Sequence, residues 1–150
     1  MKSKILVVVI LLAVLGAGGV YLAANKSTTN EDVANEQSNT KSAEFIPESF
    51  QNIKAAHYVS SNPSNNALLN SSVDTVAIKF NFDLAPPSKI NVTLNGADVT
   101  KSATSISSDK LTLTIPVTAN QTGNYKVEYA ACWPDGSCHD GSYGFSIKLP

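Results

Sequence analysis

The sequence contains no arginine, a single methionine at position 1, and only two cysteines. Lysine supplies all of its fixed positive charge, and the formal net charge of the 150-residue chain is −1 at pH 7. Nucleic-acid-binding domains concentrate basic side chains on one face, so this near-neutral composition argues against a nucleic acid partner. Apolar residues with a helical period are also missing after residue 24, which argues against a helical domain.

The one long apolar run covers residues 5–24 and follows Lys2 and Lys4. A run of about 20 residues spans a bilayer core, whereas the apolar part of a cleaved signal peptide has about 7 to 15 residues. We therefore expect residues 1–24 to form a single-pass anchor in the cell membrane, with a cleaved signal segment and a secreted product as the alternative. The lysines predict that the remainder is extracytoplasmic, either periplasmic or extracellular.

Residues 25–55 are rich in Asn, Ser, Thr, Glu, Gln and Lys and have almost no apolar pattern before Phe45. Such a segment buries too little apolar surface to offset the entropy of ordering it, so we expect a disordered, flexible tether. The short piece EFIPESFQNI, residues 44–53, is ambiguous, and the alternative is that it packs on the edge of the domain.

From Ala56 onward apolar and polar residues alternate, which is the pattern of half-buried strands. The expected inward residues are Val76, Ile78, Phe80, Phe82, Ile90, Val92, Leu94, Leu111, Leu113, Ile115, Tyr125, Val127, Tyr129, Tyr143, Phe145 and Ile147. Turn-forming segments separate these runs, and Asn95-Gly96 is the sharpest hairpin signal. Residues 56–150 are therefore predicted to be an all-β domain, an antiparallel sandwich or barrel of about seven short strands.

The stretch CWPDGSCHDGSYGF, residues 132–145, contains both cysteines. Two cysteines in an exported domain most often form a disulfide, here across a turn built from Pro134 and Asp135-Gly136. One alternative is a thiolate site for Cu(I) or zinc formed by Cys132, Cys138 and His139, although familiar zinc patterns use C-x2-4-C rather than C-x5-C. Unpaired thiols are the other alternative.

The two histidines lie at opposite ends of the expected domain, with His57 before the first strand and His139 before the last. First and last strands of a Greek-key sandwich commonly run near each other, which would bring both imidazoles together with Asp135 or Asp140. Two imidazoles and a carboxylate suit Cu(II), zinc or nickel better than calcium. The alternative is that the histidines are unrelated surface residues.

Two segments, residues 56–84 and 122–149, resemble the opening and closing halves of a CopC-type copper-resistance domain. The residues that carry the resemblance are His57, Ser61, Pro63, Phe80, Gly123, Tyr125, Val127, Asp135, Gly141, Ser142 and Phe145. The resemblance covers about residues 56–150. It implies an Ig-like or cupredoxin-like Greek-key fold and Cu(II) as the ligand, with zinc less favoured.

The family's Cu(II) ligands are an amino-terminal His, which often also uses its amine, and the Asp and His of a D-x-H motif. His57 and Asp135 match this pattern, whereas an alignment without gaps puts Ser137 at the second His and leaves His139 two residues later. A shift of two residues keeps the same face of an extended strand. The resemblance thus implies His57, Asp135 and His139 as ligands, with Asp140 as a less favoured oxygen ligand.

Two departures from the family affect the expected site. If the anchor stays attached, residues 25–56 precede His57, which then offers an imidazole without a free amine. Methionine occurs only at position 1, so the methionine-rich Cu(I) site of some family members is absent.

The sequence thus predicts a membrane-tethered protein that binds copper for buffering, delivery or resistance, with a copper transporter or acceptor protein as partner. The alternative is an Ig-like structural or interaction module at the cell surface with no metal role. No enzyme is expected, because the chain has no G-x-S-x-G elbow and no recognisable nucleophile and base pair.

Overall fold

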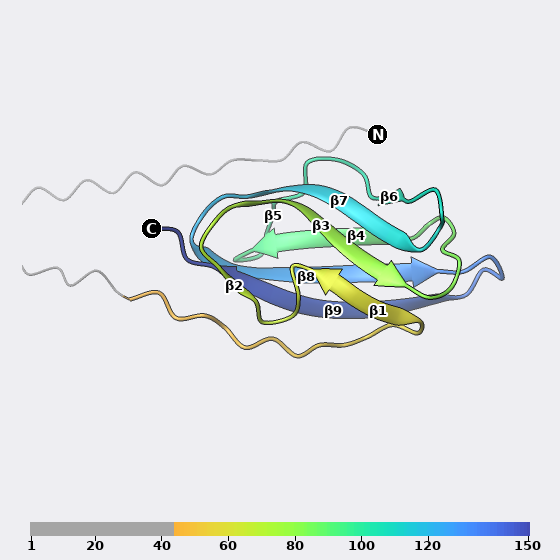
Figure 1. Cartoon of the computed structure of the whole chain (residues 1–150), viewed down its shortest axis with the longest axis horizontal. Helices are drawn as coiled ribbons and strands as arrows, with labels where there is room; N and C mark the ends of the chain where they lie inside the picture. The colour runs from red at the N-terminus through yellow and green to blue at the C-terminus, as the bar shows by residue number, and fades with distance from the viewer. Residues whose placement is uncertain (1–43) are drawn as a thin grey trace, which may run out of the picture. The chain divides into compact units, whose positions relative to one another are not determined.

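The structure is a computed structural model that describes residues 44–150, and this part of the chain is all-β, as expected (Figure 1). No helix occurs between residues 44 and 150, and hence no helix there that would be long enough to cross a membrane. The expected anchor at residues 1–24 and the tether up to residue 43 lie outside the described residues. The strands are β1 (Tyr58–Asn62), β2 (Leu68–Leu69), β3 (Val73–Phe80), β4 (Lys89–Leu94), β5 (Ala97–Asp98), β6 (Ser105–Ile106), β7 (Thr112–Ala119), β8 (Gly123–Cys132) and β9 (Cys138–Ile147).

Two sheets lie one over the other. One has the strand order β1-β3-β7-β6, and the other has the order β2-β9-β8-β4-β5. All neighbours run antiparallel except β2 and β9, which pair in parallel and depart from the expected all-antiparallel arrangement. The described residues also hold nine strands rather than about seven. The additional strands β2, β5 and β6 have two residues each, which is too short for an alternating pattern to be seen in the sequence.

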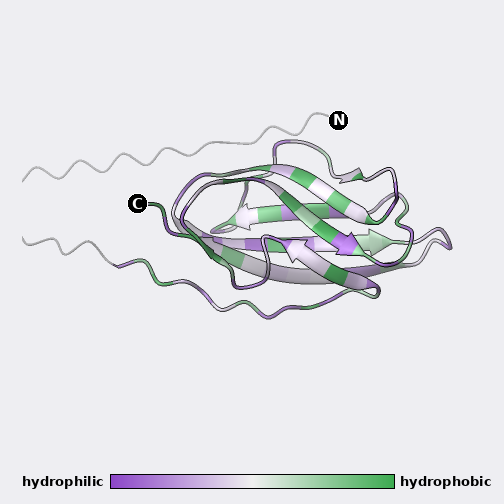
Figure 2. Ribbon diagram, in the orientation of Figure 1, coloured by the Kyte–Doolittle hydropathy of each residue, from purple (hydrophilic) through white to green (hydrophobic). Residues whose placement is uncertain are grey.

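The core lies between the sheets and is built from alternate residues of the five long strands β3, β4, β7, β8 and β9. Bands of alternating hydropathy along these strands show this arrangement in Figure 2. The fully buried large side chains are Tyr125, Tyr143, Phe80, Phe145, Ile78, Leu113, Ile147, Val76, Val92, Val117 and Val127. The expectation for Phe82 was wrong, because β3 ends at Phe80 and the chain then leaves the ladder, so that Phe82 is 48% exposed.

The β4–β5 hairpin confirms the predicted turn at Asn95-Gly96. Both residues lie in the left-handed region, with φ of 52° and 82°. A two-residue hairpin loop of type I′ requires positive φ at both positions, and Asn-Gly tolerates this better than other pairs. The turn lets Leu94 pair directly with Ala97.

Residues 46–55, which we call the strap, lie along the edge of β9. Ile53 and Ser142 exchange two backbone hydrogen bonds of 2.8 and 2.9 Å. The Phe50 N–H donates to Asn66 Oδ1 at 2.7 Å. The segment EFIPESFQNI therefore packs on the edge of the domain, which was the alternative expectation. The strap covers a sheet edge that would otherwise expose unpaired backbone groups.

The strap runs the length of the sandwich. Near its beginning the Glu48 N–H donates to Asn124 Oδ1 at 3.0 Å, close to the start of β8. Near its end the Ala55 N–H donates to the hydroxyl of Tyr129 at 3.2 Å, close to the end of β8. In Figure 1, residue 44 and the carboxyl terminus accordingly lie at one end of the domain, and the β8–β9 turn lies at the other.

Candidate metal centre

The turn between β8 and β9, residues 133–137, contains the expected ligand Asp135. The Trp133 N–H donates to the Ser137 carbonyl at 2.9 Å, and the Gly136 N–H donates to the Trp133 carbonyl at 3.0 Å. Gly136 has a φ of 85°, which suits a three-residue hairpin loop whose last residue is left-handed. Pro134 occupies the second position of the four-residue turn 133–136, where proline is favoured because its φ is already restricted.

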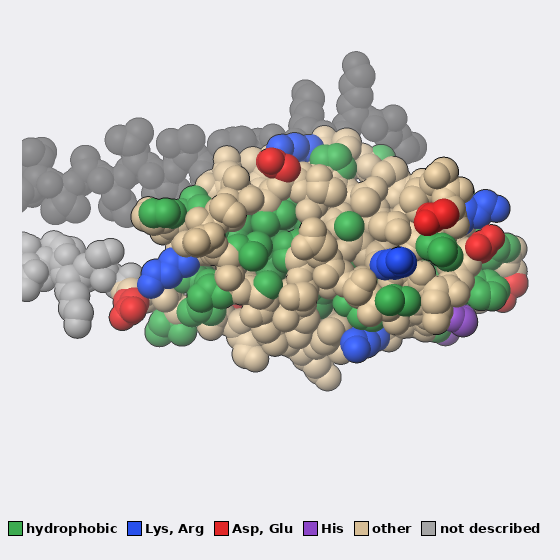
Figure 3. Space-filling view, viewed as in Figure 1, with side chains coloured by type: hydrophobic (Ala, Val, Ile, Leu, Met, Phe, Trp, Pro, Cys, Tyr) green, Lys and Arg blue, Asp and Glu red, His purple; other side chains and the backbone are tan. Residues whose placement is uncertain are grey.

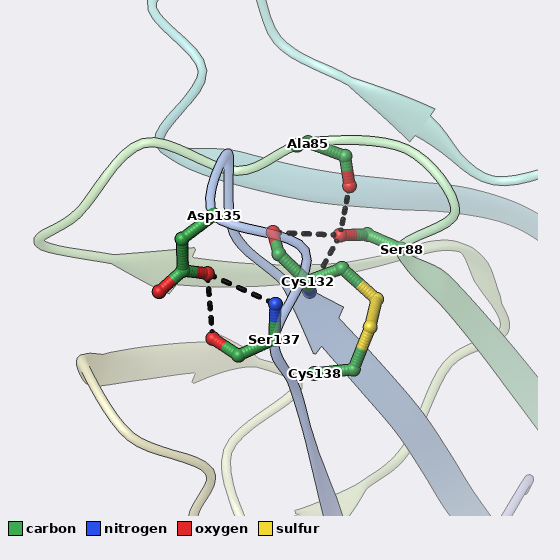
Figure 4. The surroundings of a disulfide bond; sticks show 6 residues. All are labelled: Ala85, Ser88, Cys132, Asp135, Ser137 and Cys138. Carbon is green, nitrogen blue, oxygen red and sulfur yellow. Dashed lines mark hydrogen bonds between the residues drawn. A yellow bond between two sulfur atoms is a disulfide. The ribbon is translucent and has the colours of Figure 1, made fainter.

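Cys132 and Cys138 close the base of this turn with a disulfide, which confirms the preferred interpretation of the two cysteines (Figure 4). They are opposite each other in the β8–β9 ladder, with 4.0 Å between their Cα atoms. The Cys132 N–H donates to Ser88 Oγ at 2.9 Å, and its carbonyl accepts from the Ala85 N–H at 2.8 Å. Neither cysteine is free, so the Cu(I) or zinc thiolate site is not present in this state of the protein.

Asp135 projects from the tip of the turn and is exposed. Its Oδ1 accepts hydrogen bonds from the Ser137 hydroxyl at 2.7 Å and from the Ser137 N–H at 2.9 Å (Figure 4). Because both bonds favour the charged form, they lower the pKa of Asp135 below its ordinary value, and nearby His139 lowers it slightly further. Asp135 is therefore a carboxylate at neutral pH, and its Oδ2 has no hydrogen bond to any residue between 44 and 150.

His57 lies directly before β1 with a φ of 61°. Its Nδ1 is 3.2 Å from Asn81 Oδ1, and its ring stacks on Phe82 with 4.8 Å between centroids. The indole of Trp133 meets the same imidazole edge-on at 5.3 Å. No pattern in the sequence predicted these contacts, because Asn81 and Phe82 reach His57 only after β3 ends and the chain turns away from the sheet.

His139 also lies beside this indole. It pairs with Ala131 on β8, it is exposed, and its ring centroid lies 6.3 Å from that of Trp133. The structure thus brings both histidines to one end of the domain, where histidine, acidic and hydrophobic side chains are visible in Figure 3. Trp133, only 5% exposed, is near both rings, and its inward position follows from the alternation that also buries Tyr129.

Asp140 lies apart from these residues. Successive residues of a strand point to opposite faces, so Asp140 and His139 diverge. Asp140 instead lines a shallow groove on the outer face of the five-stranded sheet together with Glu128 and Ser142.

The expected donors share one end of the domain without converging on a point. Among residues 44–150, no three His, Cys, Asp or Glu side chains lie close enough to hold one metal ion together. The donor types nevertheless fit copper, because imidazole nitrogen is a good ligand for it and His57, His139 and Asp135 are all exposed. Rotation of exposed side chains such as His139 and Asp135 is inexpensive, so their donor atoms are available to an ion even though the three expected ligands do not converge.

Comparison of this chain with known proteins and structures assigns it to a protein family. A family model described as the CopC domain matches residues 58–148. A crystal structure of CopC from Methylosinus trichosporium OB3b is 23% identical, with a TM-score of 0.57, and the match covers 64% of this chain and 95% of that one. PcoC, a methionine-rich copper resistance protein from Escherichia coli, is 22% identical with a TM-score of 0.52, covering 62% and 100%. At these identities the structural likeness shows the fold alone, and no curated protein matches the sequence. The family model spans most of the β-sandwich, and the chain belongs to the CopC domain family.

Proposed function

We propose that this protein binds copper outside the cytoplasm, as a buffer, a delivery protein or part of a resistance system. The observation that carries the proposal is the proximity of both His57 and His139 to Trp133, in the hairpin region that also holds the ionised turn residue Asp135. Membership of the CopC domain family supports it, as do the printed descriptions of CopC and of PcoC as a copper resistance protein.

The proposed cargo is Cu(II), with zinc as the less favoured ion. Imidazole nitrogens and a carboxylate oxygen suit a Cu(II) ion, which favours a square-planar or tetragonal set of nitrogen and oxygen ligands. His57, His139 and Asp135 are the proposed ligands. Because the three donors do not converge before the ion binds, binding is expected to be weaker than in a site whose ligands already converge. Weak, reversible binding suits a protein that passes its cargo on.

We further propose that residues 5–24 anchor the protein in the cell membrane. The described domain begins at the end opposite to the β8–β9 turn (Figure 1). The histidine-bearing end is proposed to be the part that meets a copper transporter or an acceptor protein. The proposed role is one of binding, without catalysis.

Copper titration of the full chain tests the proposal. Trp133 is the only tryptophan, and it contacts both histidine rings, so Cu(II) bound there should quench the intrinsic fluorescence. The EPR spectrum should show nitrogen ligands. The double variant His57→Ala, His139→Ala should lose both signals, whereas Asn120→Ala, in the loop between β7 and β8, should keep them.

The main alternative is a surface module in which both histidines are incidental. That alternative predicts a melting temperature that is the same with copper, with zinc and with a chelator. An unquenched Trp133 in the wild-type chain, or quenching that survives the loss of both histidines, would contradict the proposed site.

A further inference from the structure

We infer that His57 binds its metal through Nε2 alone, because Asn81 holds the other ring nitrogen, Nδ1, in its protonated form. The inference rests on the proposed function, in which His57 is a copper ligand. It adds the identity of the donor atom, and it assigns to Asn81 the role of a positioning residue. Nothing in the sequence pattern singled out Asn81.

Asn81 contacts His57 twice. Its backbone N–H donates to the His57 carbonyl at 3.0 Å, and its Oδ1 lies 3.2 Å from His57 Nδ1. An amide oxygen can only accept, so the hydrogen bond requires that Nδ1 carry the proton. A neutral imidazole has one protonated nitrogen and one lone pair, and the lone pair is then on Nε2.

The backbone and the ring packing of His57 hold this orientation. A φ of 61° is uncommon for a residue other than glycine and persists only where surrounding contacts maintain it. Here the backbone hydrogen bond from Asn81 supplies such a contact. The imidazole is also stacked on Phe82, at an interplanar angle of 24°, and meets the Trp133 ring at 87°. Together these contacts restrict rotation of the ring.

The strap excludes a second mode of copper binding by His57, in which a free main-chain amine and Nδ1 chelate the ion together. The Ala55 N–H bonds to Tyr129, so the chain immediately before His57 is part of the fold. The His57 nitrogen is a peptide nitrogen rather than a free amine. A chelate ring through the main-chain nitrogen and Nδ1 would also have to break the contact with Asn81. Nε2 is therefore the donor available without disturbing the fold, and His57 is a single-point ligand.

Metal-binding histidines commonly have a hydrogen-bond partner for the ring nitrogen that does not bind the metal. A metal-binding histidine usually donates its remaining N–H to a carbonyl or carboxylate oxygen, which sets the tautomer and the ring direction. Loss of such a partner typically weakens metal binding by about 10 to 100-fold. Asn81 has the position and the chemistry for this role.

The first test needs no metal. In the full chain with ¹⁵N-labelled histidine, metal-free and above pH 8, two-dimensional NMR should show His57 with a protonated Nδ1 and an unprotonated Nε2. Exposed His139, which has no hydrogen bond to the described residues, serves as the internal reference for a freely exchanging ring. A His57 that carries its proton on Nε2 would overturn the inference, whatever the copper result.

The second test uses matched variants at Asn81. Asn81→Leu removes the acceptor and keeps the size and the backbone N–H, and Asn81→Asp restores an acceptor. We expect Asn81→Leu to bind Cu(II) about 10 to 100-fold more weakly, and Asn81→Asp and the distant Asn120→Leu to bind about as well as wild type. The tautomer preference of His57 should disappear only in Asn81→Leu.

These outcomes separate the two claims. Full copper affinity in His57→Ala would overturn His57 as a ligand and thus the proposed function as stated. Loss of affinity in His57→Ala together with full affinity in Asn81→Leu would overturn only the role of Asn81. Because the NMR measurement is made on the wild-type chain, it decides the tautomer even if Asn81→Leu does not fold.

Discussion

At the scale of single residues, short hydrogen bonds decide what the candidate ligands offer. Asp135 is fully exposed, yet its carboxylate is held by Ser137 within the same turn. His57 is exposed as well, and its direction is set by Asn81. The residue types of Asp135 and His57, together with the resemblance to the CopC family, were enough to propose them as ligands. Their partners depend on the turn and on the end of β3, and those could not be read from the residue types.

Replacing Ser137 by Ala should raise the pKa of Asp135 toward its ordinary value, because one of the two hydrogen bonds to the carboxylate is removed. The folded-state pKa is lowered, so these bonds stabilise the folded protein above about pH 4, the ordinary carboxyl pKa, and lose this effect as the pH falls through the lowered value. The carboxyl carbon shift of Asp135, followed by NMR between about pH 2 and 6, measures the change.

Ser102→Ala, an exposed serine outside the turn, is the control and should leave the titration of Asp135 as it is in the wild type. An identical titration of Asp135 in the Ser137→Ala variant would show that the hydroxyl does not bond the carboxylate in solution. Copper affinity at neutral pH should change little, since Asp135 is ionised in either case.

At the scale of elements, the β8–β9 hairpin organises the site. Alternation along a strand places Trp133 and His139 on the inner side, and it sends Asp140 to the outer face with Glu128. The same alternation places Cys132 and Cys138 on the side away from His139. The sequence predicted this alternation correctly, because it depends only on the period of two. The end of β3 at Phe80 was missed, since an apolar residue at position 82 continues the pattern after the pairing has stopped.

Removing the disulfide with Cys132→Ala and Cys138→Ala should lower the free energy of unfolding by about 2 kcal/mol, the entropy that a cross-link of this short loop removes from the unfolded chain. Denaturant unfolding measures the loss. Wild-type protein kept in reductant should lose a similar amount, which controls for the smaller alanine side chains.

An unchanged unfolding midpoint in the alanine variant would contradict a stabilising role for the bridge. The variant should still bind Cu(II), because the cysteines are on the face opposite to the proposed ligand His139. If copper binding disappeared in a variant that remains folded, the sulfur atoms would have to be part of the metal site.

At the scale of the whole molecule, the strap joins the amino-terminal side of the domain to both ends of the sandwich. It begins beside Asn124, pairs with β9 through Ile53, and leads directly into His57. The ring of Phe50 lies over Gly144, where a side chain of any size would overlap it. The strap therefore links the stability of the sheet edge to the position of the candidate ligand.

Gly144→Ala should push Phe50 out of its place and loosen the strap. Inserting a methyl group where there is no room typically costs about 1 to 3 kcal/mol. Hydrogen exchange should become faster at the amides of Phe50 and Ile53, whose bonds depend on the strap, while amides of β3 and β7 should follow only the overall change in stability.

Gly96→Ala provides a contrast, because open space surrounds that glycine and only its positive φ disfavours a side chain. It should destabilise the β4–β5 turn without faster exchange in the strap. Unchanged exchange at Phe50 and Ile53 in Gly144→Ala would show that the strap is not held by this contact.

The sequence by itself determined the long strands, the Asn95-Gly96 turn and the resemblance to the CopC family, because period-two burial and turn chemistry act between residues close together in the chain. It also favoured the disulfide without excluding the alternatives. Only the tertiary structure decided that the strap pairs with β9, that β2 and β9 run in parallel, and that His57 meets Asn81, Phe82 and Trp133. These contacts join segments far apart in sequence, and their formation depends on how the two sheets and their connecting loops pack together.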